Sequence, residues 1–246
     1  MAPAPVLQVF GQPASTDVAR VLACLFERNL HFQLVRTDAV NRAQHLPAGA
    51  SVETSWYPSG HVTLKHGGTI LSDSRDICRY VCTEFPRDRA GGSLYGEGSL
   101  ERASVEKWLR TEARCFDAPC TEMAAHYCRH LALAPTTPAD DEGYGGGAAE
   151  SSERRLRRVL DVYDDALARN RYLAGDEFSL ADLSHLPNAH RLAGSNKMGR
   201  RLLGSVKNVA RWYEAVSARP AWQRVVATQS GAPHHYITCY NWSHFS

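Results

Sequence analysis

The sequence predicts two domains of different fold class, an α/β domain followed by an all-α domain. Three observations support this prediction. The first 36 residues have a strand–helix–strand pattern, Gly67-Gly68 separates two short runs of strand-forming residues, and after residue 86 the pattern becomes helical. We expect an α/β domain over residues 1–86, a linker over 87–98, an all-α domain over 99–228 and a tail over 229–246.

The α/β domain is expected to contain one mixed four-stranded sheet. An alternating apolar run over residues 5–10 predicts the first strand, and helical spacing from Ser15 to about Asn29 leads to a second strand at 31–35. A strand–helix–strand unit of this kind favours parallel strands. Gly67-Gly68 then predicts a hairpin between residues 61–65 and 69–71, because tight hairpin turns need positive φ. A helix follows directly after the hairpin.

The second half shows helical periodicity almost throughout. Residues 99–131 predict a long helix bent at Pro119, and residues 152–169 predict another. Residues 135–151 between them are so polar and glycine-rich that we expect a flexible insertion. Further on, Asp182 stands three residues after Ser179, which predicts a capping box at a helix start and a structural role for Asp182.

The tail, residues 231–246, contains three histidines, Cys239 and four aromatic residues. A metal site is one interpretation of this composition, but the spacing fits no standard ligand pattern. We therefore expect no metal, and a tail that is disordered or folds over a neighbouring surface.

Composition argues against several classes of protein. The 28 basic and 26 acidic residues are interspersed and give a net charge of +2, so we expect no nucleic-acid surface. No apolar run approaches the roughly 18 residues needed to cross a membrane, and the N-terminus lacks a signal-peptide pattern. Seven cysteines without a CxxC motif indicate reduced thiols and a cytoplasmic protein. Cys78 and Cys82, one helical turn apart, are predicted to be small buried groups.

Ser15 is the first candidate functional residue. It stands between a strand and a helix, where serine is a preferred N-cap. The positive end of the helix dipole stabilises an anion at such a position without any charged side chain. From this stretch alone, an ordinary cap and an anion-binding hydroxyl are both consistent with the sequence.

Five segments distributed over the chain carry a family resemblance. They are Ser15-Thr-Asp-Val-Ala-Arg-Val-Leu22, Asp73-Ser-Arg-Asp-Ile-Cys-Arg-Tyr80, Trp108-Leu-Arg-Thr-Glu-Ala113, Tyr172 to Leu183, and Trp212-Tyr-Glu through Ala218-Arg-Pro220. Together with the domain order they resemble the cytosolic glutathione transferases, and within these the plant phi class. The resemblance runs from residue 6 to about residue 228 and is more specific for the fold than for the activity.

The resemblance implies a thioredoxin-like first domain that binds glutathione as co-substrate, with Ser15 stabilising the thiolate. It implies further glutathione contacts from His61, Val62, Asp73 and Ser74. Residues expected to line a pocket for a small hydrophobic electrophile are Gln12, Ala14, Thr16, Phe116 and Cys120. The family also implies a homodimer. Helix capping is the alternative interpretation for Asp73 and Ser74, and a place in the core is the alternative for Phe116.

The sequence departs from the family pattern around the third strand. Thr63 stands where the family has a cis-proline, in the register kept by Pro58, Gly60 and Val62, and His61 replaces a glutamine. A cis bond before a residue other than proline costs about 2.5–4 kcal/mol, so we predict a trans Val62–Thr63 bond or a strained cis one. The His-Lys pair that clasps the glycine carboxylate in the family has no clear counterpart in residues 44–53.

Three hypotheses for the function remain open at this point. The first is an enzyme that conjugates glutathione to hydrophobic electrophiles, which the presence of Ser15 and Ser74 favours. The second is a non-catalytic or weakly catalytic binding protein with an altered glutathione site, which Thr63 favours. The third is an interaction protein that uses a dimer surface, the 135–151 insertion and the aromatic tail.

Overall fold

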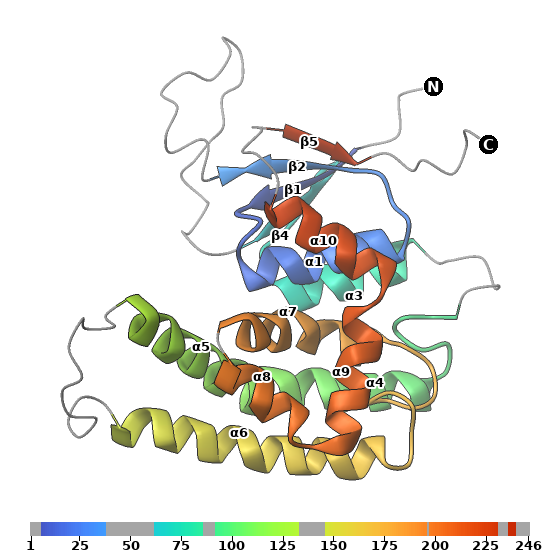
Figure 1. Cartoon of the computed structure of the whole chain (residues 1–246). Coiled ribbons are helices and arrows are strands. Elements are labelled where there is room, and N and C mark those ends of the chain that lie inside the picture. The colour runs from blue at the N-terminus through green and yellow to red at the C-terminus, as the bar shows by residue number, and fades with distance from the viewer. Residues whose placement is uncertain are drawn as a thin grey trace, which may run out of the picture. The chain divides into compact units, whose positions relative to one another are not determined.

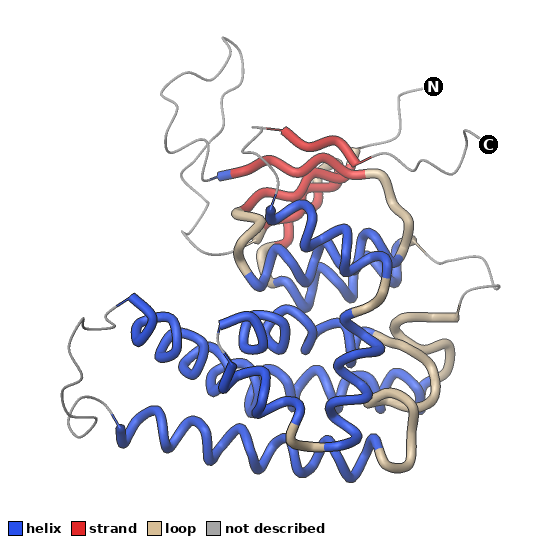
Figure 2. Tube along the Cα trace, viewed as in Figure 1, coloured by secondary structure: helices blue, strands red, loops and turns tan. Residues whose placement is uncertain are grey.

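The computed structural model describes residues 6–37, 62–85, 92–132, 146–195, 197–230 and 236–239. Two compact units make up the chain (Figure 1). Unit 1 comprises Met1–Ser93 together with Arg219–Ser246, and unit 2 comprises Leu94–Ala218. All strands of the described residues lie in unit 1, as Figure 2 shows in red.

The N-terminal part of unit 1 has the predicted element order. It contains β1 (Leu7–Gly11), α1 (Thr16–Glu27), β2 (Phe32–Arg36), β3 (Thr63–His66), β4 (Thr69–Leu71) and α3 (Ser74–Glu84). β1 and β2 are parallel, whereas β3 is antiparallel to both β1 and β4. Gly67 has φ 58° in the turn between β3 and β4, a conformation that glycine adopts without strain. The mixed four-stranded sheet is therefore confirmed.

A fifth strand extends this sheet, and the sequence analysis did not predict it. β5 (Tyr236–Cys239) pairs antiparallel with β2, which gives the strand order β4-β3-β1-β2-β5. Part of the tail therefore pairs with the edge of the sheet. Residues 236–240 are rich in β-branched and aromatic types, which is the signal that predicts a strand.

The last helix also belongs to unit 1, which corrects the expected boundary at residue 228. α10 (Pro220–Ser230) packs on α1, and both lie with α3 on one face of the sheet (Figure 1). Arg219 forms a bidentate ion pair with Glu27 of α1, with N···O distances of 2.5 and 2.8 Å. The Arg224 guanidinium stacks 4.1 Å above the Phe26 ring. These contacts attach the C-terminal segment to the α/β unit.

The regular secondary structure in the described residues of unit 2 is helical. Its elements are α4 (Ser99–Thr111), a π-helical segment η3 (Glu112–Phe116), α5 (Asp117–Ala132), α6 (Gly146–Leu167), α7 (Leu180–Ser195), α8 (Lys197–Gly204) and α9 (Lys207–Ser217). An isolated bridge joins Tyr172 to Gly175 in the loop before α7. The expected bend at Pro119 is wrong in position, because the interruption lies at η3. Proline has no N–H to donate, and the wider π turn before Pro119 accommodates its ring within the first turn of α5.

The expected insertion is shorter than predicted. α6 begins at Gly146, so residues 146–151 are helical, while residues 133–145 lie outside the described residues. The start of α7 confirms the predicted structural role of Asp182. This carboxylate is fully buried and accepts the backbone N–H groups of Leu173 and Ser179 and the indole N–H of Trp212.

Within the described part of the chain, no helix has the length and apolar character needed to cross a lipid bilayer. No cluster of three or more metal-ligating side chains occurs among the described residues either. The tail histidines considered above lie outside them.

Candidate glutathione site

Ser15 occupies the N-cap of α1, as the sequence predicts. Its backbone is extended (φ −69°, ψ 136°), and its Oγ accepts the N–H of Asp17 at 3.3 Å. The turn before it is closed by a bond from the Ser15 N–H to the Gln12 carbonyl at 2.9 Å. Because the side chain is only half-buried, its hydroxyl proton is available to an acceptor outside the helix.

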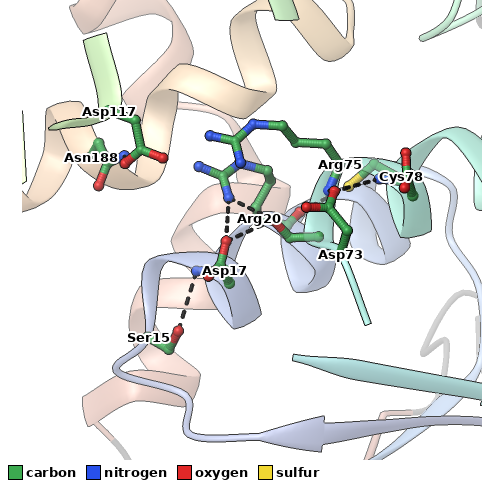
Figure 3. Close-up of polar contacts among 10 residues, drawn as sticks. Ser15, Asp17, Arg20, Asp73, Arg75, Cys78, Asp117 and Asn188 are labelled. Atoms are coloured by element: carbon green, nitrogen blue, oxygen red, sulfur yellow. Dashed lines mark hydrogen bonds and ion pairs between the residues drawn. The ribbon is translucent and has the colours of Figure 1, made fainter. Parts of the chain in front are cut away.

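A buried network connects the first turn of α1 to the first turn of α3 (Figure 3). Arg20 is 1% exposed, and its Nη1 donates to Asp17 Oδ1 at 2.7 Å and to Ser74 Oγ at 2.8 Å. Ser74 Oγ in turn donates to Asp17 Oδ1 at 2.7 Å. The one proton of the Ser74 hydroxyl thus goes to Asp17, so towards glutathione, which we expected it to contact, this hydroxyl can only accept.

Asp73 is the N-cap of α3. Its Oδ1 accepts the N–H groups of Arg75 and Asp76 at 2.8 and 3.0 Å, and its side chain is exposed. This arrangement shows the capping role that the sequence analysis gave as an alternative. Oδ2 is left for a cationic ligand group, so capping and ligand binding are compatible at Asp73.

The network brings the N-termini of two helices together, because Asp17 and Ser74 lie in the first turns of α1 and α3. Each N-terminus carries about half a positive charge and N–H groups without helical acceptors. The Asp17 carboxylate opposes this field, but the Arg20 guanidinium compensates its charge at 2.7 Å. The site therefore favours an anion beside Ser15.

The peptide bond between Val62 and Thr63 is trans, since no described peptide bond is cis. This agrees with the first of the two predicted alternatives. Both residues are buried, and Thr63 pairs with Phe10 at the start of β3. His61 and residues 44–53 lie outside the described residues.

Comparisons with known proteins show the family of this chain. Family profiles described as the glutathione S-transferase N-terminal and C-terminal domains match residues 9–90 and 123–220. Glutathione S-transferase F11 of Arabidopsis thaliana is 32% identical over 90% of this chain and 97% of its own length. This chain belongs to the glutathione S-transferase family. Glutathione S-transferase 3 of Zea mays is also 32% identical, over 90% of this chain and 93% of its own length.

Solved structures of glutathione transferases have the same fold. The crystal structure of poplar glutathione transferase F1 has a TM-score of 0.74 and 34% identity, and the match covers 93% of this chain and all of that chain. The F2 enzyme of Populus trichocarpa has a TM-score of 0.70 at 34% identity, over 91% of this chain and 98% of its own. The F designation of these relatives confirms the resemblance to the phi class.

The residues expected to line an electrophile pocket lie in two environments. In unit 1, Gln12 and Ala14 are exposed and Thr16 is half-buried, all next to Ser15. In unit 2, Phe116 and Cys120 are buried.

Phe116 lies inside the core of unit 2. Its ring contacts Tyr163 and His185, with centroid distances of 5.7 and 5.1 Å. Burial, followed by the nearby charges of Glu112 and Asp117, raises the pKa of the Cys120 thiol well above its usual value. Cys120 therefore remains a neutral, apolar group.

Asp17 is the residue that the sequence analysis missed. It forms an ion pair with Arg20, three residues further along α1, at 2.7 Å. The signal was present in the sequence, because residues three apart on a helix are neighbours. The additional bond to Ser74 depends on how α1 and α3 pack, which the local pattern does not contain.

Proposed function

We propose that this protein conjugates the thiolate of glutathione to small hydrophobic electrophiles, with Ser15 stabilising the thiolate. One observation carries the proposal: the half-buried Ser15 caps the N-terminus of α1, which lies beside the N-terminus of α3. Maize glutathione S-transferase I, a relative of the same fold, has been solved with an atrazine glutathione conjugate. We extend that type of ligand to this chain as part of the proposal.

The chemistry requires stabilisation of the thiolate relative to the thiol. A free thiol has a pKa near 8.5, so most of it is protonated at neutral pH. A hydrogen bond to a charged acceptor contributes about 1.5–3 kcal/mol, which corresponds to a pKa lowered by about one to two units. Ser15 Oγ already accepts the Asp17 N–H, and its own proton can point to a sulfur bound near the N-terminus of α1.

Ser15 acts by stabilising charge and not as a nucleophile. The described hydrogen bonds of its side chain give it no histidine or other base partner. The remaining catalytic contribution comes from holding the two substrates in the reactive orientation. Homodimer formation and a cytoplasmic location are parts of the same proposal.

A second candidate is a binding protein of the same fold that carries apolar ligands without turnover. Two observations favour it. The Ser74 hydroxyl is held by Arg20 and Asp17, and Thr63 replaces the proline of the family pattern. Ser74 and Thr63 belong to the part of the site expected to hold glutathione, whereas Ser15 affects how its thiol ionises.

A pair of matched serine variants tests the catalytic proposal. Ser15→Ala removes the hydroxyl beside the thiol, and turnover of a chlorinated nitrobenzene with glutathione should fall about 10- to 100-fold at neutral pH. Ser179→Ala is the control. Ser179 caps α7 in unit 2 with the same 3.3 Å bond to the N–H two residues on, so it loses a similar cap without affecting Ser15.

The pH dependence separates mechanism from damage to the fold. The pH profile of kcat/KM for the chlorinated nitrobenzene, measured at saturating glutathione, reports the pKa of the bound thiol. In Ser15→Ala this pKa should rise towards that of free glutathione, while Ser179→Ala should leave it unchanged. If Ser15→Ala keeps its rate within a factor of ten, the thiolate mechanism is wrong. If the wild-type protein is neither retained on immobilised glutathione nor active, the conjugation proposal fails and the binding protein is favoured.

A further inference from the structure

Three cysteines meet between α1 and α3 of unit 1, and the proposed activity uses none of them. Cys24 comes from α1, and Cys78 and Cys82 come from successive turns of α3. The Sγ atoms of Cys24 and Cys82 are 3.9 Å apart, although the residues are 58 positions apart in sequence. The two helices pack side by side along this contact (Figure 1).

The surroundings of the three thiols differ. Cys24 is fully buried, and hydrogen bonding to Cys78, then to Cys82, and then burial raise the pKa of its thiol well above the usual value. Cys78 is 1% exposed, and its Sγ lies 3.8 Å from the Arg20 carbonyl. Cys82 is half-buried, so of these three it has the most surface open to solvent.

We propose that Cys24 and Cys82 form a reversible oxidation site, in which hydrogen peroxide converts the two thiols into a disulfide that links α1 to α3. The sulfurs are already in contact, and a disulfide requires about 2.0 Å between them. The remaining approach is of the size that a side-chain rotation supplies. Cys78 also interacts with Cys24, but it is 1% exposed and its thiol donates to the Arg20 carbonyl, so peroxide from solvent meets Cys82 first.

The reaction balances in two steps. Peroxide reaches the half-buried Cys82, whose thiol loses its proton and whose sulfur attacks one oxygen. The O–O bond breaks, a sulfenic acid forms, and the hydroxide that leaves takes up the thiol proton as water. Cys24 Sγ then attacks the Cys82 sulfur, the S–O bond breaks, and a second water takes up the hydroxyl and the Cys24 proton. Overall, two thiols lose two hydrogen atoms and one peroxide is reduced to two waters.

The disulfide would connect the two helices whose N-termini form the candidate glutathione site. Ser15 caps α1 and Asp73 caps α3, so a covalent link between the helices holds these caps in a fixed relation. The oxidation site is chemically independent of the proposed conjugation, because it needs neither glutathione nor Ser15. A dithiol reductant returns both cysteines to thiols.

Trypsin makes the test specific, because Arg79 lies between the two cysteines of α3. Cleavage places Cys24 in peptide 21–28, Cys78 in peptide 76–79 and Cys82 in peptide 80–87. The folded protein is treated with hydrogen peroxide in a Cys115→Ser background, which removes the exposed thiol of η3. Remaining thiols are then alkylated under denaturing conditions, and the digest is analysed by mass spectrometry.

We expect the disulfide-linked pair of peptides 21–28 and 80–87 to be at least ten times as abundant as the linked pair 21–28 and 76–79. Reduction should abolish both pairs. The same treatment in urea should remove this preference. Cys78→Ala should keep the link, and Cys82→Ala should abolish it. Cys24→Ala should leave a Cys82 sulfenic acid that dimedone traps.

Two results would overturn the proposal. One is equal linkage to both α3 peptides in the folded protein. The other is conversion of Cys82 to sulfinic or sulfonic acid without the link to Cys24. Both are read from the Cys115→Ser protein alone, so a folding defect in a core cysteine variant does not affect the conclusion.

Discussion

Asp182→Ala is expected to destabilise unit 2 strongly, because one buried carboxylate serves four donors. Its Oδ1 accepts the Leu173 N–H and the Trp212 indole N–H, each at 2.9 Å. Its Oδ2 accepts the Ser179 N–H at 3.1 Å and the Ser179 hydroxyl at 3.3 Å. The carboxylate thereby joins the loop before α7, the start of α7 and the middle of α9.

The magnitude follows from the donors that alanine leaves without an acceptor. A lost cap costs about 1 kcal/mol, and each buried donor without a partner costs about 1–3 kcal/mol. Burial of the carboxylate offsets part of this, because a desolvated charge is removed with it. We expect the free energy of unfolding to fall by roughly 3–5 kcal/mol for Asp182→Ala, and by less for Asp182→Asn, which keeps one oxygen.

Urea denaturation followed by far-UV circular dichroism measures this loss. Asp161→Ala, which removes an exposed carboxylate of α6, is the matched control and should change stability by less than about 0.5 kcal/mol. Trp212→Phe should show a coupling energy of about 1 kcal/mol with Asp182→Asn in a double-mutant cycle. A loss below about 1 kcal/mol for Asp182→Ala would refute the reasoning, since the four donors would then have found other acceptors.

The pH dependence of stability gives a second measurement on the same residue. Burial raises the pKa of Asp182 above its ordinary value of 3.8, although four hydrogen bonds act in the opposite direction. The folded state therefore binds more protons than the unfolded state between pH 3.8 and the folded pKa, and stability falls as pH rises through that window. The stability difference between wild type and Asp182→Asn should shrink as pH rises above 3.8, and a growing difference would contradict this direction.

Three further predictions concern packing and polar contacts. Gly199→Ala places Cβ 2.1 Å from a backbone carbonyl oxygen of α7 and should lower the free energy of unfolding by about 1–3 kcal/mol. Gly194→Ala, whose Cβ has nothing within 4 Å, is the control and should not destabilise the protein. Equal unfolding midpoints for the two variants would contradict this. Arg219→Lys loses the bidentate contact to Glu27 and should lower the free energy of unfolding by about 1 kcal/mol. In a double-mutant cycle, the same substitution made in a Glu27→Gln protein should have little effect. Tyr163→Phe removes the hydroxyl that donates to a buried histidine at 2.6 Å, and thermal melting should show a loss of about 1–2 kcal/mol.

Much of unit 1 could be predicted from the sequence because its signals are local. The Ser15 cap, the Gly67-Gly68 turn and the alternating strands depend on neighbouring residues, and the structure has each of them in place. β5 was not predicted, because β2, the strand with which it pairs, lies about 200 residues earlier in the chain. α10 followed the helical pattern of unit 2, and its attachment to α1 through Arg219 depends on a long-range ion pair.

The candidate site likewise has features that could be predicted from the sequence and features that could not. Ser15 and Asp73 could be placed as caps from residue type and position alone. The hydrogen bonds of the Ser74 hydroxyl with Arg20 and Asp17 could not be predicted, because they depend on the relative position of two helices more than 50 residues apart in sequence. The π-helical segment at Glu112–Phe116 was missed because its cause, the proline that follows, was assigned its usual effect of bending the helix locally.

The division of the chain has a consequence for its synthesis. Unit 2 is one continuous stretch, whereas unit 1 is built from both ends of the polypeptide. During translation, which adds about 5–20 residues per second, unit 2 can complete its fold while the β2 edge and the α1 face still lack their C-terminal partners. Unit 1 therefore finishes last, after residues 219–239 have left the ribosome, and a nascent chain stalled before that point presents a bare sheet edge to other chains.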